Sequence, residues 1–169
     1  MRIREATAED VEAIVALVES AYRGEASRAG WTTEADLLDG QRTDADEVSR
    51  LLPSLLLAVD GDELVGCCAL EVRDGHGHFG MFAVRPELQG RGVGSLLLAE
   101  TERLAHARGL DRTELTVLSG RTELLAFYQR RGFTPSGQTR PFPYGDERFG
   151  LPRRDDLVFL TLSKRHVRP

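Results

Sequence analysis

Apolar positions recur every three to four residues in the first amphipathic stretch of the chain, residues 11–22, which predicts a helix. Thr7 and Asp10 ahead of this stretch resemble a capping box, and Gly24 after it predicts the end of the helix. Three more helices are expected: a short one from Asp44, a leucine-rich one that ends at Gly109 and one at residues 121–131. The leucine-rich helix is expected to face a sheet with Val93, Leu96, Leu97 and Leu104.

Short apolar runs bounded by turn residues predict strands in the rest of the chain. Turns at residues 60–62 and 74–77, each with an Asp-Gly pair, separate three such runs and predict an antiparallel meander. The expected strands are residues 1–5, 55–59, 63–72, 78–84, 114–118, a strand from 133 that Pro135 interrupts, and 157–162, followed by a frayed tail at 164–169. Without internal repeats or a linker, residues 1–169 predict a single α+β domain: a mixed, mostly antiparallel central sheet flanked by helices.

Composition and charge narrow the class of function. The chain is 41% hydrophobic and 29% charged, which is ordinary for a globular protein, and no segment approaches the ~20 apolar residues of a membrane helix. Because the first residues lack the apolar region of a signal peptide, we expect a cytoplasmic protein without a membrane partner. The net charge of −5 offers no basic stripe for phosphates, which argues against a nucleic-acid partner.

The cysteines and histidines predict no metal site. Cys67 and Cys68 are neighbours in an apolar run, and neighbours on a strand point to opposite faces. They therefore suit neither a disulfide nor a metal-ligand pair, and we expect two buried hydrophobic side chains. The four histidines form no zinc-binding pattern.

A glycine-rich loop joins the third strand of the meander to the leucine-rich helix. Gly90, Gly92 and Gly94 let the backbone approach a ligand, and the free N–H groups of the first helical turn favour an anion. Arg91 adds a positive charge. A simple strand-to-helix turn, the alternative, needs only one glycine. A Walker loop would require a lysine, and a Rossmann fingerprint would require glycine where Ser95 stands.

The loop fits the pattern Q/R-x-x-G-x-G/A and resembles the coenzyme A pyrophosphate loop of the GNAT N-acetyltransferase superfamily. A second signature, Tyr-x-x-x-Gly-Phe, is present at residues 128–133, and the order of elements is similar over most of the chain. The resemblance implies the GNAT acyl-CoA N-acyltransferase fold, with acetyl-CoA as cosubstrate. It implies that the pantetheine arm binds the backbone of Phe82 and Val84. The residues implied to hold the pyrophosphate are Gln89, Gly90, Arg91, Gly92, Val93, Gly94 and Ser95.

One position departs from the family pattern. Arg121 stands where many relatives carry an Asn that touches the pantetheine arm. A guanidinium group has donors but no acceptor, so it cannot copy that contact. Arg121 is therefore expected to contact a cofactor phosphate or the substrate instead.

The resemblance also implies catalytic roles. Tyr128 corresponds to the tyrosine that protonates the departing thiolate in the family; the alternative is an aromatic core residue beside Phe127. His78 stands six residues before Val84, where relatives often place a glutamate base, and on an ideal strand it shares one face with Gly80, Phe82 and Val84. Glu71 on the neighbouring strand and a water molecule are the other candidates for the base.

The function that follows is transfer of the acetyl group of acetyl-CoA to a primary amine of a small molecule or peptide by direct attack. Because Arg121 departs from the pattern and no carboxylate base is evident, a non-catalytic acyl-CoA-binding or sensor domain is the alternative. Dimers are common in the family, so a homodimer is allowed.

Two sets of residues favour different acceptors. Trp31, the acidic residues between positions 34 and 47, and the aromatic pair Phe142 and Tyr144 favour a cationic amine. The opposite set, which favours an acceptor with a carboxylate, is Arg42, Arg140 and Arg148.

Overall fold

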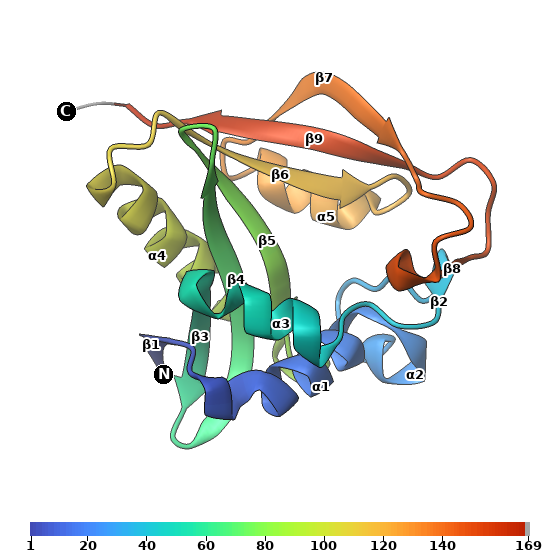
Figure 1. Cartoon of the computed structure of the whole chain (residues 1–169), viewed down its shortest axis with the longest axis horizontal. Helices are drawn as coiled ribbons and strands as arrows, with labels where there is room; N and C mark the ends of the chain where they lie inside the picture. Colours follow the sequence, from blue (N-terminus) through green and yellow to red (C-terminus); the bar gives the residue numbers. More distant parts are fainter. Residues whose placement is uncertain (168–169) are drawn as a thin grey trace.

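A seven-stranded sheet in the order β1-β3-β4-β5-β6-β9-β7 forms the centre of the computed structural model, which describes residues 1–167 (Figure 1). The strands are β1 (Arg2–Glu5), β3 (Leu55–Asp60), β4 (Glu63–Arg73), β5 (His76–Val84), β6 (Arg112–Leu118), β7 (Thr134–Pro141) and β9 (Val158–Arg165). Among the strands of residues 1–167, only β5 and β6 pair in parallel. A separate short ladder joins β2 (Leu38–Asp39) to β8 (Leu151–Pro152). The predicted α+β class with a mostly antiparallel sheet is confirmed.

Helices cover both faces of the sheet (Figure 1). The α-helices are α1 (Val11–Tyr22), α2 (Gly24–Ser27), α3 (Ala45–Leu51), α4 (Val93–Ala107) and α5 (Thr122–Gln129). Short 3-10 turns lie at η1 (Ala8–Asp10), η2 (Leu52–Ser54), η3 (Pro86–Leu88) and η4 (Glu147–Phe149). Apolar side chains of α1 and α3 form one core against β3 to β5, and those of α4 and α5 form the other core on the opposite face.

The predicted start signals act as expected. The Asp10 carboxylate accepts the backbone N–H of Thr7 at 2.8 Å and pairs with Arg4, which holds the turn ahead of α1. Asp44 caps α3 by accepting the N–H of Glu47 at 2.8 Å. Each cap satisfies a backbone donor that the first helical turn leaves free.

The two hairpins of the meander are also confirmed, with one change. The second turn is only two residues long, because Asp74 and Gly75 both adopt positive φ, as a tight hairpin turn requires. His76 and Gly77, expected in the turn, are the first residues of β5 and pair with β4.

Two other expectations are wrong. Leu96 was expected to face the sheet but is 40% exposed, since Val93, Leu97 and Leu98 occupy the buried face of α4. Residues 164 and 165 were expected in a frayed tail but belong to β9, which continues to Arg165 and pairs there with Arg112 of β6. Residues 168 and 169 lie outside the described residues. The helix predicted at residues 121–131 is confirmed as α5, and Gly132 closes it as predicted: its φ is 87°, and the N–H groups of Gly132 and Phe133 donate to the carbonyls of Gln129 and Tyr128.

Cys67 and Cys68 lie in different cores, as their adjacent positions on a strand predict. Burial raises the pKa of the Cys68 thiol to about 12 and that of Cys67 further, so both remain protonated thiols. Within residues 1–167, no group of three or more His, Cys, Asp or Glu side chains is placed to hold a metal ion. None of the helices in this range has both the length and the apolar character of a membrane span.

A bulge in β5 reverses the faces of its side chains. Met81 has a φ of 47°, and the pairing of β4 with β5 shifts between Cys67 and Ala69. As a result Phe79 packs in the core beside α4 and α5, whereas Met81 packs in the core beside α1. The prediction that His78, Gly80, Phe82 and Val84 share one face is therefore wrong. Phe82 and Val84 lie on the α4 face, and the two residues ahead of the bulge lie on the other.

After His78, ahead of the bulge, β5 and β6 separate. Their parallel pairing joins Gly77 to Thr113 and His78 to Glu114 at one end of the strands. From there the two strands diverge, as Figure 1 shows. The sheet is thus open at its middle, between its N-terminal and C-terminal halves.

The orientation of α4 can be tested with two adjacent leucines. Replacing buried Leu97 by alanine removes a fully buried side chain, and we expect the free energy of unfolding to fall by about 3 kcal/mol. Leu96→Ala on the exposed side should cost less than about 1 kcal/mol. Urea unfolding of both variants measures the difference; equal losses would contradict the helix orientation described here.

Candidate functional site

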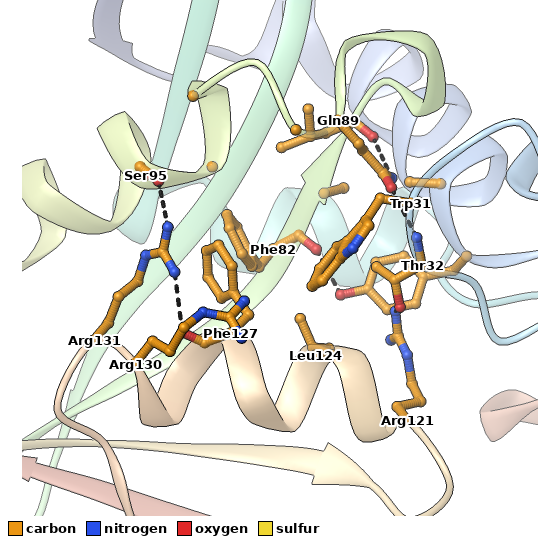
Figure 2. A pocket seen from close by; sticks show the side chains of 17 residues that line it. Trp31, Thr32, Phe82, Gln89, Ser95, Arg121, Leu124, Phe127, Arg130 and Arg131 are labelled. Carbon is orange, nitrogen blue, oxygen red and sulfur yellow. Dashed lines mark hydrogen bonds between the residues drawn. The ribbon is translucent and has the colours of Figure 1, made fainter.

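Two cavities adjoin where β5 and β6 diverge. The first, of about 420 Å³, lies between the glycine loop and α5 (Figure 2). The second, of about 600 Å³, lies between β5, β6 and the segments around α3 and η4. The residues that line both are Tyr22, Phe82, Arg121 and Leu124. These shared residues mark the place where a ligand in one cavity would meet a ligand in the other.

The three glycines of the loop serve different needs. Gly90 and Gly92 have φ values of 78° and 91°, in the left-handed region that favours glycine. Gly94 is needed for close packing, because a Cβ at this position would lie 2.9 Å from the ring of Phe82. The loop then enters α4, whose first N–H groups have no acceptor within the helix. A simple turn would need only one of these glycines, so the geometry supports a cradle for an anion.

Most residues expected to bind the cofactor line the first cavity: Phe82, Val84, Gln89, Gly90, Gly92, Gly94, Ser95 and Arg121. Arg91 and Val93 do not line it. The Val93 side chain is buried in the core, so only its backbone faces the loop, and the Arg91 side chain is exposed.

The first cavity is apolar in its middle and cationic at its ends. Figure 2 shows Phe82, Leu124 and Phe127 along the middle, Arg130 and Arg131 at one end and Arg121 at the other. Arg131 donates to Ser95 Oγ at 2.7 Å, which joins α5 to the first turn of α4. Burial and the neighbouring Arg130 lower the pKa of Arg131. This layout suits a long ligand with an anionic group near Ser95 and an uncharged arm.

Side chains already contact the strand backbone expected to bind that arm. Tyr22 donates its hydroxyl to the Phe82 carbonyl at 2.5 Å. Gln89 donates through Nε2 to the Val84 carbonyl at 3.2 Å, and its Oε1 accepts the N–H of Thr32 at 3.1 Å (Figure 2). Each carbonyl has a second lone pair that can accept from a ligand. Gln89 also ties the segment with Trp31 and Thr32 to the glycine loop.

Tyr128 lines the second cavity and is otherwise enclosed by aromatic rings. Its ring centroid lies 5.7 Å from Phe133, 6.2 Å from Phe82 and 6.3 Å from Phe79. Burial raises the pKa of the Tyr128 hydroxyl well above 10, so the group keeps its proton. The residue is thus both a core aromatic and a proton donor at a cavity wall.

The two side chains considered as bases lie apart from Tyr128. His78 and Glu71 are cross-strand partners on β5 and β4, and neither is among the residues that line the two cavities. Glu71 forms ion pairs with Arg50 and Arg73. Burial, followed by the nearby Arg73, lowers the pKa of His78.

A buried charge cluster forms a wall of the second cavity. Glu34 pairs with Arg23 and, at 2.9 Å, with Arg121, and all three side chains are buried. Burial alone would raise the pKa of Glu34, but the charges of Arg121, Arg23 and Arg42 outweigh it and lower that pKa. Glu34 is therefore ionised.

The two sets of residues proposed to favour different acceptors lie in different places. Arg42, Arg140 and Arg148 all line the second cavity. Trp31 lines the first cavity instead. Phe142 is buried in a separate small core, and Tyr144 donates to the carbonyl of Arg154, so the expected aromatic wall does not form.

The model of the acetyltransferase (GNAT) family matches residues 12–133, which hold the glycine loop, the bulged strand and the Tyr-x-x-x-Gly-Phe signature. The chain belongs to the GNAT acetyltransferase family. Structures with this GNAT fold include Rv2747 from Mycobacterium tuberculosis in complex with CoA and NLQ (TM-score 0.65, 21% identity, 99% of this chain and 100% of that one). Another is a ribosomal-protein-alanine N-acetyltransferase from Brucella melitensis (TM-score 0.71, 21% identity, 98% and 100%).

A curated relative of this GNAT chain is more similar in sequence over a shorter stretch. The mycothiol acetyltransferase of Clavibacter michiganensis is 41% identical over 80 residues, or 47% of this chain. The match covers 26% of that relative, so the chain spans about a quarter of its length.

Sequence reasoning missed several residues of this GNAT site. Arg130 and Arg131 directly follow the signature tyrosine and its neighbour, and a cationic pair at the end of a helix facing a phosphate loop was a usable signal. Tyr22 gave only an apolar helical spacing, with no sign of its bond to β5. The pairing of Arg23 with Glu34 depends on a tertiary contact that no local pattern reports.

Removing the carboxylate of Glu34 should destabilise the fold, because Arg23 and Arg121 would remain buried without a counter-charge. We expect Glu34→Gln to lower the free energy of unfolding by about 3–5 kcal/mol, measured by urea denaturation. Since the pKa of Glu34 is lowered on folding, its contribution is present above the unfolded-state value of about 4.3 and declines as the pH falls below it. The control is Asp36→Asn, which breaks an exposed pair with Arg28 and should change stability little. Equal effects of the two variants would contradict a buried network.

Proposed function

We propose that this chain is an acetyl-CoA-dependent N-acetyltransferase, which transfers the acetyl group to a primary amine of a small molecule or peptide by direct attack. The observation that carries the proposal is the junction of the two cavities at Phe82, with the glycine loop on one side and Tyr128 on the other. We take residues 1–169 as one catalytic domain. The cytoplasmic location and a homodimer remain predictions.

The residues of the first cavity fit acetyl-CoA. Gly90 to Ser95 supply backbone N–H groups for the pyrophosphate, and Gly94 lets the start of α4 lie directly against the Phe82 ring, where a Cβ would clash. Arg130 and Arg131 supply positive charge at the same end. The bulged backbone at Phe82 and Val84 is free of β6 and borders the cavity as an unpaired strand edge, which suits the amide-containing pantetheine arm. Acetyl-CoA would supply the acetyl group as a thioester.

Tyr128 acts as the general acid in this proposal. The lone pair of the neutral amine forms the new C–N bond, the C–S bond breaks, and the electron pair goes to sulfur. Tyr128 Oη–H, which its raised pKa keeps protonated at neutral pH, then supplies the proton that the thiolate takes up, and the phenolate regains a proton from water. Direct attack is favoured over an acyl-enzyme because Cys67 and Cys68 are buried in the cores as thiols.

The proton that leaves the amine needs an acceptor. His78 and Glu71 line neither cavity, and Glu71 is engaged by two arginines. Glu34 does line the second cavity, but its pairing with Arg23 and Arg121 makes it a weak base. We therefore propose that water in the second cavity takes the proton.

Gly92→Ala tests the role of the loop. Both Gly92 and Gly75 have positive φ and open space at the Cβ position, so alanine at either should lower stability by about 1–2 kcal/mol. Only Gly92 lines the first cavity, so only Gly92→Ala should weaken coenzyme A binding, by about tenfold or more in Kd measured by calorimetry. Equal coenzyme A affinity in the two variants would refute the loop assignment.

Tyr128→Phe tests the general acid. We expect kcat for acetyl transfer to fall about 100-fold or more while the Kd for coenzyme A stays unchanged. Because a proton donor acts below its pKa, the wild-type rate should rise with pH as the amine loses its proton, with no fall due to Tyr128 up to about pH 10. Tyr144→Phe, outside both cavities, is the matched control. The rate is measured as release of free thiol from acetyl-CoA. A non-catalytic acyl-CoA sensor would show no thiol release even in the wild type.

A further inference from the structure

The buried charge cluster of the second cavity has more positive than negative charge. Arg23, Arg42 and Arg121 surround Glu34, which is the carboxylate that pairs with two of them. The Nε atoms of Arg23 and Arg121 are buried without a hydrogen-bond partner in the described part of the chain. Buried cations are costly unless they are paired. In the buried cluster two arginines thus share one carboxylate.

Arg42, which is half-buried and lies beside this cluster, is open to a ligand. Its guanidinium lies 5.0 Å from the centre of the Tyr22 ring and lines the second cavity, and within residues 1–167 it has no ion pair. Besides Glu34, the carboxylates whose charges act on Arg42 are those of Glu47 and Glu19. Glu19 accepts the backbone N–H groups of Arg42 and Thr43, and Glu47 accepts the Thr43 hydroxyl. Within residues 1–167 neither forms an ion pair with the Arg42 side chain.

The cluster lies close to the junction of the cavities. Arg121 also sits over the Tyr22 ring, 5.1 Å from its centre, and lines both cavities. The hydroxyl of that same Tyr22 contacts the Phe82 carbonyl at the junction. An anion held by Arg42 and Arg121 would therefore lie near the ring of Tyr22, and the hydroxyl of the same residue marks the junction at Phe82 where the amine would react.

We propose that Arg42 and Arg121 bind a carboxylate of the acceptor, which makes the acceptor a small molecule with an amine and a carboxylate only a few bonds apart. This inference rests on the acetyltransferase activity proposed above and names its substrate class. A planar guanidinium matches a carboxylate through two parallel hydrogen bonds. Diamines and polyamines, which carry no anion, would leave the cluster unpaired.

The acidic residues of the second cavity do not favour a cationic acceptor that lacks a carboxylate. Asp44, Asp46 and Glu47 also line it, but Asp44 and Glu47 are engaged in the cap of α3 and with Thr43. Asp46 is exposed in the first turn of that helix. Of the charged groups described here, the buried ones next to the junction are therefore mainly cationic.

The test compares each of the twenty α-amino acids with its primary amide, and includes β-alanine, 4-aminobutyrate and the diamine putrescine. Thiol release from acetyl-CoA gives kcat and KM for each. We expect at least one amino acid to be acetylated with a kcat/KM about 10- to 100-fold above that of its amide. Arg42→Gln should remove this preference by raising KM for the acid, with kcat and the KM for the amide little changed. Arg42→Lys should keep part of it.

Arg103→Gln, which removes an equal charge from an exposed pair with Glu100 on α4, is the matched control and should keep the preference. Amides or putrescine that react as well as the acids would overturn this inference and leave the proposed function standing. If no compound is acetylated, the proposed function fails, and calorimetry with the same compounds in the presence of coenzyme A decides the inference separately. Binding of an acid but not its amide, lost in Arg42→Gln, supports it; equal or absent binding of both overturns it.

Discussion

The separation of β5 from β6 is the constraint on which both cavities depend. The strands pair at one end, and the bulge at Met81 then turns the backbone of Phe82 to Val84 away from its neighbour. A continuous ladder would have closed the sheet and used the backbone groups that line the cavities. The hydroxyl of Tyr22 holds the open edge by its bond to Phe82. The site is therefore a consequence of incomplete strand pairing, supported by a side chain from α1.

The first cavity carries positive charge at both of its ends, far from the junction and next to it. Arg130 and Arg131 lie at the outer end of the first cavity, next to the start of α4, where the helix also favours negative charge. Arg121 lies at the inner end and is balanced in part by Glu34. The apolar rings between the two cationic ends keep them apart. Each end can therefore hold one anionic group of a ligand, and the two groups stay far enough apart to limit their repulsion.

Local patterns predicted much of this arrangement. The loop glycines, the caps at Asp10 and Asp44 and the hairpin turns were readable because each depends on a few neighbouring residues. The faces of β5 were not readable: a two-residue period assumes a regular strand, and the positive φ of Met81 comes from tertiary packing. The partners of Glu34 were equally hidden, since Arg23 and Arg121 come from distant parts of the chain. Thus most residues of the first cavity could be predicted, and of the second cavity Arg42, Arg140 and Arg148 could, whereas the buried pairs of Glu34 could not.

The two cavities are built from different stretches of the chain, and this has a consequence for how such a protein can diversify. The glycine loop spans residues 89–95, whereas the acceptor wall draws Arg23, Glu34 and Arg42 from the N-terminal part and Arg140 and Arg148 from the C-terminal part. Substitutions in the wall of the second cavity can therefore change its shape and charge while the loop is inherited unchanged. The exceptions are the four residues that border both cavities, Tyr22, Phe82, Arg121 and Leu124. A substitution at any of them changes the walls of both cavities at once, so these positions are the least free to vary independently.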